Sequence, residues 1–87
     1  MARVIVYSTS MCPFCVQAKR LLTERAIPYD EVDVSDDAEL RAQMVERAGG
    51  KRTVPQIFID GRSIGGYEEL AALDAAGELA GLAAHSS

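Results

Sequence analysis

The chain has 87 residues, of which 48% are hydrophobic and 25% are charged, and its formal net charge is −4 at pH 7. This length predicts a single domain over residues 1–87, too small for separate cofactor and substrate domains. An acidic chain without a basic cluster is not expected to bind nucleic acid or a membrane surface, and no apolar run approaches the roughly 18 residues of a membrane span.

The first part of the chain predicts a strand, a polar loop and a helix. Residues 3–7 are apolar and β-branched, which predicts a strand buried on both faces. This apolar stretch is too short for the core of a signal peptide, so we expect a cytoplasmic protein. Pro13 suits the first position of a helix, and Pro28 is predicted to end that helix. Apolar residues recur at helical spacing between the two prolines, at Val16, Ala18, Leu21, Leu22 and Ile27.

The middle of the chain predicts a second strand and a second helix. Residues 29–34 alternate between apolar and polar side chains, as in a half-buried strand. Ser35 or Asp36 is expected to cap the following helix, which has Glu39 in its first turn. Gly49-Gly50 is expected to end it. The apolar stripe of this helix consists of Leu40, Met44, Val45 and Ala48.

The last part of the chain predicts a hairpin and a third helix. Residues 56–60 form a third strand, and the turn at Asp60-Gly61 leads into a short fourth strand over residues 62–64. Gly65-Gly66 precedes a helix over residues 67–76, and the alanine-rich tail from Glu78 predicts one further helical turn.

The predicted order of elements is β-α-β-α-β-β-α. A β-α-β unit makes its two strands parallel through a right-handed crossover, and the hairpin adds an antiparallel pair. We therefore expect an α/β fold with a four-stranded mixed sheet flanked by three or four helices.

The two cysteines, Cys12 and Cys15, are the clearest functional feature. Structural disulfides are uncommon in the cytoplasm, so the pair is predicted to be redox-active or metal-binding. A structural zinc site needs four ligands, and these cysteines with His85 would need a second chain to complete one. A C-x-x-C motif that follows a strand and opens a helix favours thiol chemistry.

The position of each cysteine in the helix predicts unequal roles. Thiol–disulfide exchange needs a thiolate, and an unperturbed cysteine with a pKa of about 8.5 is mostly protonated at neutral pH. Cys12 lies where the helix begins, so unpaired N–H groups and the helix dipole favour its anion. Cys15 lies one turn inside the helix. We predict that Cys12 is the nucleophile and Cys15 the resolving thiol.

Four stretches of the chain occur together in the order and at the spacing of one known family. These stretches are Tyr7-Ser8, Cys12-Pro13-Phe14-Cys15, Thr53-Val54-Pro55-Gln56-Ile57-Phe58-Ile59 and Ile64-Gly65-Gly66. With them the chain resembles a dithiol glutaredoxin of the thioredoxin-fold superfamily. The resemblance implies a thioredoxin-like fold and a glutathione-dependent thiol–disulfide oxidoreductase that reduces protein disulfides and glutathione mixed disulfides.

The same resemblance implies which residues support the reaction. Pro13, Phe14 and Pro55 would support the active site, and Pro55 would follow a cis peptide bond that exposes the backbone of Val54. Glu68 or Glu69 would meet the ammonium of glutathione, although either fits a helix-dipole role as well. The residues that would bind glutathione are Arg41, Thr53, Val54, Gly66, Tyr67 and Glu68.

Positive side chains are expected near the site because glutathione carries two carboxylates. Arg41, Lys51 and Arg52 are the candidates, and Arg41 fits either a carboxylate contact or a solvated helix face. Thr9 stands where the family frequently has a lysine.

Other functions stay open at this point. One is a glutaredoxin-like protein reduced by thioredoxin reductase, and another is a dimer that carries an iron–sulfur cluster through Cys12 and glutathione. Pro13 and the second cysteine argue against the cluster. A redox-inactive interaction module is a third possibility. We expect a monomer with no metal cofactor, glutathione as reductant, and disulfide-bonded or glutathionylated proteins as substrates.

Overall fold

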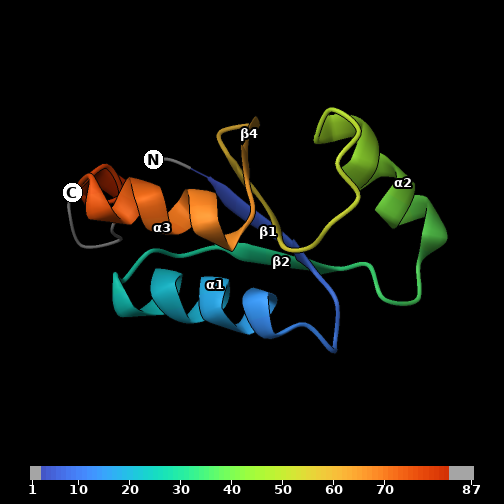
Figure 1. Cartoon of the computed structure of the whole chain (residues 1–87), viewed down its shortest axis with the longest axis horizontal. Coiled ribbons are helices and arrows are strands. Elements are labelled where there is room, and N and C mark those ends of the chain that lie inside the picture. The colour runs from blue at the N-terminus through green and yellow to red at the C-terminus, as the bar shows by residue number, and fades with distance from the viewer. Residues whose placement is uncertain (1–2, 83–87) are drawn as a thin grey trace.

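The computed structural model describes residues 3–82 as a sheet with helices on both faces (Figure 1). The predicted order β-α-β-α-β-β-α is confirmed, and the predicted strands and third helix agree with the structure to within one residue at each end. The expected extra turn after Glu78 is a 3₁₀ helix. In chain order the elements are β1 (Val4–Ser8), α1 (Pro13–Glu24), β2 (Asp30–Asp33), α2 (Ala38–Arg47), β3 (Gln56–Ile59), β4 (Arg62–Gly65), α3 (Tyr67–Ala75) and η1 (Ala80–Leu82).

The four strands form one mixed sheet in the order β2-β1-β3-β4. Strand β1 pairs with β2 in parallel, since α1 carries the chain back along the sheet between them. Strand β3 is antiparallel to both β1 and β4. The turn between β3 and β4 has positive φ at Asp60 (51°) and Gly61 (81°), the pattern that two-residue hairpins prefer.

Alternation along the central strands divides the core between the two faces of the sheet. Val4 and Val6 point to the face covered by α1 and α3, where Leu22 and Leu70 are fully buried. Tyr7 points to the other face and packs with residues of α2. Buried residues of that second cluster are Tyr7, Val34, Met44, Ala48 and Phe58.

Helix α1 ends three residues earlier than predicted. Its last residue is Glu24, and Ala26 adopts a left-handed φ of 58°. The N–H of Ile27 then bonds to the carbonyl of Leu22 and that of Ala26 to Thr23, which is a Schellman termination. Ile27 is 3% exposed, so its apolar side chain packs in the core from the terminating loop. The apolar spacing predicted its burial correctly and its helical conformation wrongly.

Helix α2 is capped by Asp37, so the prediction of Ser35 or Asp36 is wrong. The Asp37 carboxylate accepts the N–H of Leu40 at 2.9 Å. Ser35 has a different role, because its hydroxyl accepts the N–H of Ser10 at 2.8 Å. This bond ties the end of β2 to the loop that precedes Cys12. Gly49 and Gly50, both with positive φ, follow the helix as expected.

Within residues 3–82, no helix is both long and apolar enough to cross a membrane.

Candidate active site

Cys12 is the N-cap residue of α1, and its sulfur takes the place of a capping oxygen. The Sγ atom accepts the backbone N–H of Cys15 at 3.2 Å. The Cys12 thiol also donates to the carbonyl oxygen of Val54, with 3.6 Å between the sulfur and the oxygen. Pro13 occupies the first turn, where its missing N–H costs nothing. The half-buried sulfur therefore sits at the positive end of the helix dipole, which favours an anion.

Cys15 differs from Cys12 in its environment. It is 1% exposed, and both thiols are free rather than joined in a disulfide. Burial and the neighbouring Cys12 sulfur raise the pKa of the Cys15 thiol to about 12. One sulfur of the pair is thus accessible at a helix end, and the other is a buried, protonated thiol one turn away.

The segment before β3 lies directly against the Cys12 sulfur. The Val54–Pro55 peptide bond is cis, as the resemblance implied. Pro55 is buried, and Val54 is half-buried. Gln56 holds this segment from within the sheet, since its Nε2 donates to the carbonyl of Thr53 at 2.9 Å and to its hydroxyl at 3.2 Å. The carbonyl of Val54 is therefore held against the Cys12 sulfur.

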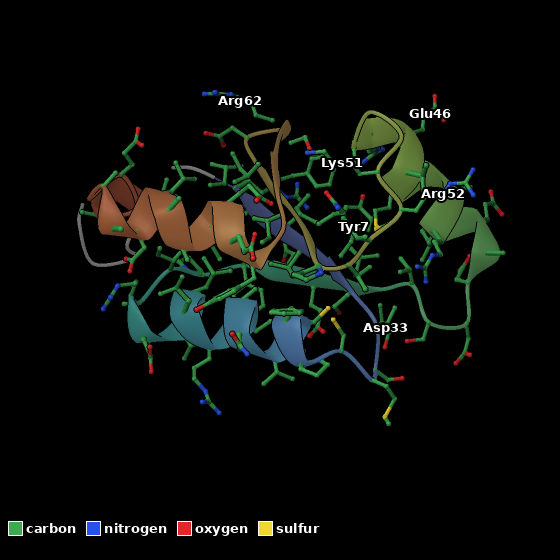
Figure 2. All side chains as sticks on the ribbon, viewed as in Figure 1. Tyr7, Asp33, Glu46, Lys51, Arg52 and Arg62 are labelled. Carbon is green, nitrogen blue, oxygen red and sulfur yellow. The ribbon has the colours of Figure 1, made fainter. Side chains whose placement is uncertain are left out.

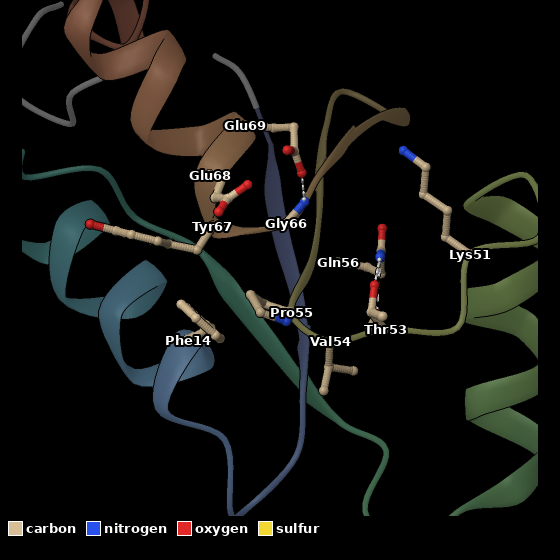
Figure 3. Close-up of a pocket in the computed structure, with 10 residues that line it drawn as sticks. All are labelled: Phe14, Lys51, Thr53, Val54, Pro55, Gln56, Gly66, Tyr67, Glu68 and Glu69. Atoms are coloured by element: carbon tan, nitrogen blue, oxygen red, sulfur yellow. Dashed lines mark hydrogen bonds between the residues drawn. The ribbon is translucent and has the colours of Figure 1, made fainter.

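A pocket of about 430 Å³ opens next to this segment (Figure 3). It joins the start of α1, the segment before β3 and the start of α3. The rings of Phe14 and Tyr67 stack along one side, with centroids 6.4 Å apart and planes at 28°. The residues that line the pocket are Phe14, Lys51, Thr53, Val54, Pro55, Gln56, Gly66, Tyr67, Glu68 and Glu69.

The start of α3 forms the acidic side of this pocket. The N–H of Gly66 donates to the Glu69 carboxylate at 2.7 Å, so this amide has a partner within the chain. Tyr67 and Glu68 follow in the first turn, where backbone N–H groups have no partner within the helix. Gly65 has a φ of 120°, which residues with a side chain rarely adopt, and a Cβ there would lie 2.7 Å from the Glu69 carboxylate, which would have to shift.

The three basic candidates separate into two places. Lys51 lines the pocket, on the side of α2 that faces the β3–β4 hairpin (Figure 2). Arg41 lies outside it, and its guanidinium donates to the carbonyl of Arg52 at 3.1 Å. Arg41 and Arg52 instead border a second hollow along α2, of about 360 Å³. The structure thus brings Thr53, Val54, Gly66, Tyr67 and Glu68 together around the pocket and leaves Arg41 apart.

Gln56 is a site residue that the sequence reasoning did not identify. It is 1% exposed, and its Oε1 has no hydrogen-bond partner among residues 3–82. In Figure 3 its amide nitrogen faces Thr53, and the oxygen points away from that residue. A glutamine that opens an apolar strand, before Ile57-Phe58-Ile59, was the available signal, because a buried amide needs partners for both of its ends.

Metal ligands do not gather in the described chain. Among residues 3–82, no group of three or more His, Cys, Asp or Glu side chains is arranged to hold a metal ion. His85, considered above as a zinc ligand, lies outside the described residues.

Comparison with known proteins decides the family. The model of the glutaredoxin family matches residues 4–64, which contain both cysteines and the Val54–Pro55 segment. The chain belongs to the glutaredoxin family. It is 45% identical over 78 residues to a probable glutaredoxin of Synechocystis sp., covering 90% of this chain and 89% of that protein. It is 44% identical to glutaredoxin 3 of Escherichia coli K12, covering 91% and 94% of the two chains.

The fold agrees with solved glutaredoxin structures. A structure titled as a buckwheat glutaredoxin–glutathione complex superposes with a TM-score of 0.82, at 25% identity and over 95% of this chain and 83% of that one. The thioredoxin-like fold expected for this glutaredoxin is confirmed. Membership in the family, together with a free C-x-x-C pair at a helix start, makes the protein a thiol–disulfide oxidoreductase.

Proposed function

We propose that the protein uses glutathione to reduce protein disulfides and glutathione mixed disulfides, with Cys12 as nucleophile and Cys15 as resolving thiol. The observation that carries this proposal is the pocket beside the Cys12 sulfur. It has a basic side chain, Lys51, at one end and two glutamates at the start of α3 at the other. A small peptide thiol with charged groups at both ends matches this distribution.

The groups of glutathione correspond to distinct parts of the pocket. The carboxylates would face Lys51 and the free N–H groups of the first turn of α3, and the ammonium would face Glu68. An N–H of the peptide would satisfy the buried Oε1 of Gln56. The glutathione named in the buckwheat complex supports glutathione as the ligand by similarity.

The reaction follows from the placement of the two sulfurs. The Cys12 thiolate attacks the glutathione sulfur of a mixed disulfide. A bond forms between Cys12 and glutathione, the old sulfur–sulfur bond breaks, and the other half of the substrate leaves as a thiolate. A second glutathione then attacks this new disulfide, which releases oxidised glutathione and regenerates Cys12. With a protein disulfide, the Cys12 thiolate first bonds to one substrate sulfur, and the other substrate sulfur leaves as a thiolate. Cys15 then loses its proton and attacks the Cys12 sulfur, and the bond between Cys12 and the substrate breaks. The substrate leaves with two electrons, and the enzyme keeps a Cys12–Cys15 disulfide. Two glutathione molecules then reduce the enzyme.

The cellular compartment and the oligomeric state of the protein are also part of what we propose. We place the protein in the cytoplasm, where the glutathione pool is reducing, and we expect it to act as a monomer. Size-exclusion chromatography with light scattering would test the monomer directly.

The proposal is tested by supplying electrons from two sources. One reaction contains NADPH, glutathione, glutathione reductase and a small glutathione mixed disulfide, and a parallel reaction contains thioredoxin reductase in place of glutathione and its reductase. We expect NADPH consumption in the first only. Turnover in the second only would keep Cys12 and Cys15 as the redox pair and refute the glutathione site.

The same material tests the remaining alternative. The visible spectrum of anaerobically purified protein would show a cluster by its colour, and we expect none. A Cys15→Ser variant should keep turnover of the small mixed disulfide, since that route uses only Cys12, and should lose the intramolecular route for protein disulfides.

A further inference from the structure

A polar network joins α1 to two strands next to the cysteine pair. The Lys19 ammonium donates to a carboxylate oxygen of Glu31 at 2.7 Å, and the hydroxyl of Ser8 donates to the same oxygen at 2.6 Å. Ser8 is fully buried at the end of β1, and the Lys19 side chain is only 27% exposed. The Glu31 carboxylate thus fixes the position of the Lys19 ammonium, and Ser8 of β1 in turn fixes the position of that carboxylate.

This fixed place lies beside Cys15. Lys19 follows Cys15 by four residues in α1, so the two side chains occupy the same face one turn apart. Helical side chains lean towards the N-terminus, which directs Lys19 over the turn that holds Cys15. Ser8, the anchor of the network, is followed by Thr9, whose backbone faces the Cys15 sulfur. The network therefore borders the buried thiol at two points, through the next helical turn at Lys19 and through the residue that follows Ser8.

The surroundings of Cys15 shift its pKa in opposite directions. Burial and Cys12 favour the neutral thiol and raise the pKa of Cys15. A hydrogen bond with the Thr9 backbone and, as a smaller contribution, the positive charge of Lys19 act in the opposite direction on this pKa. Bonding to Glu31 in turn raises the pKa of Lys19, which keeps the ammonium charged. A buried thiol that must become an anion thus has a lysine that keeps its proton one helical turn away.

We propose that Lys19 is a positioning residue for the resolving step, holding a positive charge where the Cys15 thiolate forms. The inference rests on the proposed roles of the two cysteines. In the step concerned, the Cys15 thiol loses its proton to solvent, its sulfur bonds to Cys12 Sγ, and the bond between Cys12 and the substrate sulfur breaks. The substrate leaves as a thiolate. Lys19 lowers the cost of the first event and takes no part in the attack by Cys12.

A chromogenic disulfide separates the two steps. Reduced protein is mixed in a stopped-flow instrument with dithiobis-nitrobenzoate, which releases a coloured thiolate at each exchange. Attack by Cys12 releases the first equivalent, and attack by Cys15 on the resulting mixed disulfide releases the second. We expect Lys19→Met to slow the second release about fivefold and to leave the first unchanged.

Matched variants distinguish a charge effect from a structural one. Lys19→Arg keeps the charge and should restore the second rate to within about twofold. Arg20→Met removes one positive charge from the next, exposed position of α1 and should change neither rate. In a Cys15→Ser background, Lys19→Met should leave turnover of a glutathione mixed disulfide unchanged, because that route does not use the resolving thiol.

Each alternative has a distinct outcome. Equal slowing of both releases, or a lower melting temperature with both rates unchanged, would reduce Lys19 to a structural ion pair and overturn the inference. A first release that survives in Cys12→Ser would instead refute the assigned roles of the cysteines. These results are separable because the first release reports on Cys12 alone.

Discussion

The backbone N–H of Cys15 donates a hydrogen bond of 3.2 Å to the Sγ of Cys12. The sulfur that we propose as the nucleophile is therefore also the N-cap acceptor of α1, in the position where serine, threonine or aspartate is usual. Because the same bond stabilises a thiolate and the first helical turn, reactivity and local stability depend on one atom. Suitable substitutions can separate these two effects.

Cys12→Ser and Cys12→Ala are expected to differ in stability although both are inactive. Serine is a strong N-cap, so Cys12→Ser should keep the free energy of unfolding to within about 0.5 kcal/mol, whereas Cys12→Ala should lose about 1 kcal/mol. Both variants lack the exposed thiol at residue 12 and keep only the buried Cys15, so both should lack exchange activity. Urea unfolding and the NADPH-coupled assay measure the two properties, and equal stability of the two variants would show that residue 12 does not act as a cap.

Alkaline pH is expected to destabilise the fold through Cys15. Burial and Cys12 raise the pKa of Cys15 from an ordinary 9.0 to about 12 in the folded protein. Below pH 9 the Cys15 thiol is protonated in both the folded and the unfolded state, so its contribution to the free energy of unfolding is fully present. Between pH 9 and about pH 12 the unfolded chain loses this proton and the folded chain keeps it. The free energy of unfolding should therefore fall as pH rises, by at most about 1.4 kcal/mol per pH unit from this group.

Cys15→Ala is the control for this prediction because alanine does not titrate. Under reducing conditions, the wild-type protein should lose more stability than Cys15→Ala between about pH 8 and about pH 10. Parallel curves for the two proteins would assign the alkaline loss to other groups. Iodoacetamide at neutral pH should label Cys12 and spare the buried Cys15.

The two adjacent glutamates of α3 are expected to have different roles. Glu69→Ala removes the acceptor of the Gly66 N–H and should lower the free energy of unfolding by about 1 kcal/mol. Glu69→Gln keeps an acceptor and should recover most of this loss. Glu68→Gln should leave stability unchanged and raise the KM for a glutathione mixed disulfide. The prediction fails if Glu68→Gln destabilises the protein as much as Glu69→Ala does.

Phe14 is expected to contribute to binding through its exposed ring. It is 55% exposed and stacks with Tyr67 along the pocket, so Phe14→Ala should raise the KM for a glutathione mixed disulfide about fivefold, with a small effect on stability. Val16 is a matched control, because it is 50% exposed on the same helix and does not line the pocket. Comparable effects of Phe14→Ala and Val16→Ala on KM would exclude a specific contact.

Local patterns in the sequence were sufficient for the order of elements and for the cysteine pair. Strand alternation, helical spacing and the Asp60-Gly61 turn each depend on residues that are neighbours along the chain, so their geometry is largely set by backbone sterics. The C-x-x-C spacing likewise places Cys15 one turn from Cys12 in any helix that begins there. The residue that caps α2 was harder to predict from the sequence, because Ser35, Asp36 and Asp37 are all good N-cap residues. Asp37 is the cap, and Ser35 instead bonds to Ser10, which is distant in the sequence.

The sequence by itself determined a glutaredoxin-like α/β chain with a thiol pair at a helix start. Only the tertiary structure placed the Val54 carbonyl at the Cys12 sulfur, separated the Arg41 side chain from the pocket and joined Lys19, Glu31 and Ser8 next to Cys15. The physical reason is distance along the chain. Val54 is 42 residues from Cys12 and Glu31 is 23 from Ser8, so these contacts form only when the sheet brings separate strands and loops together.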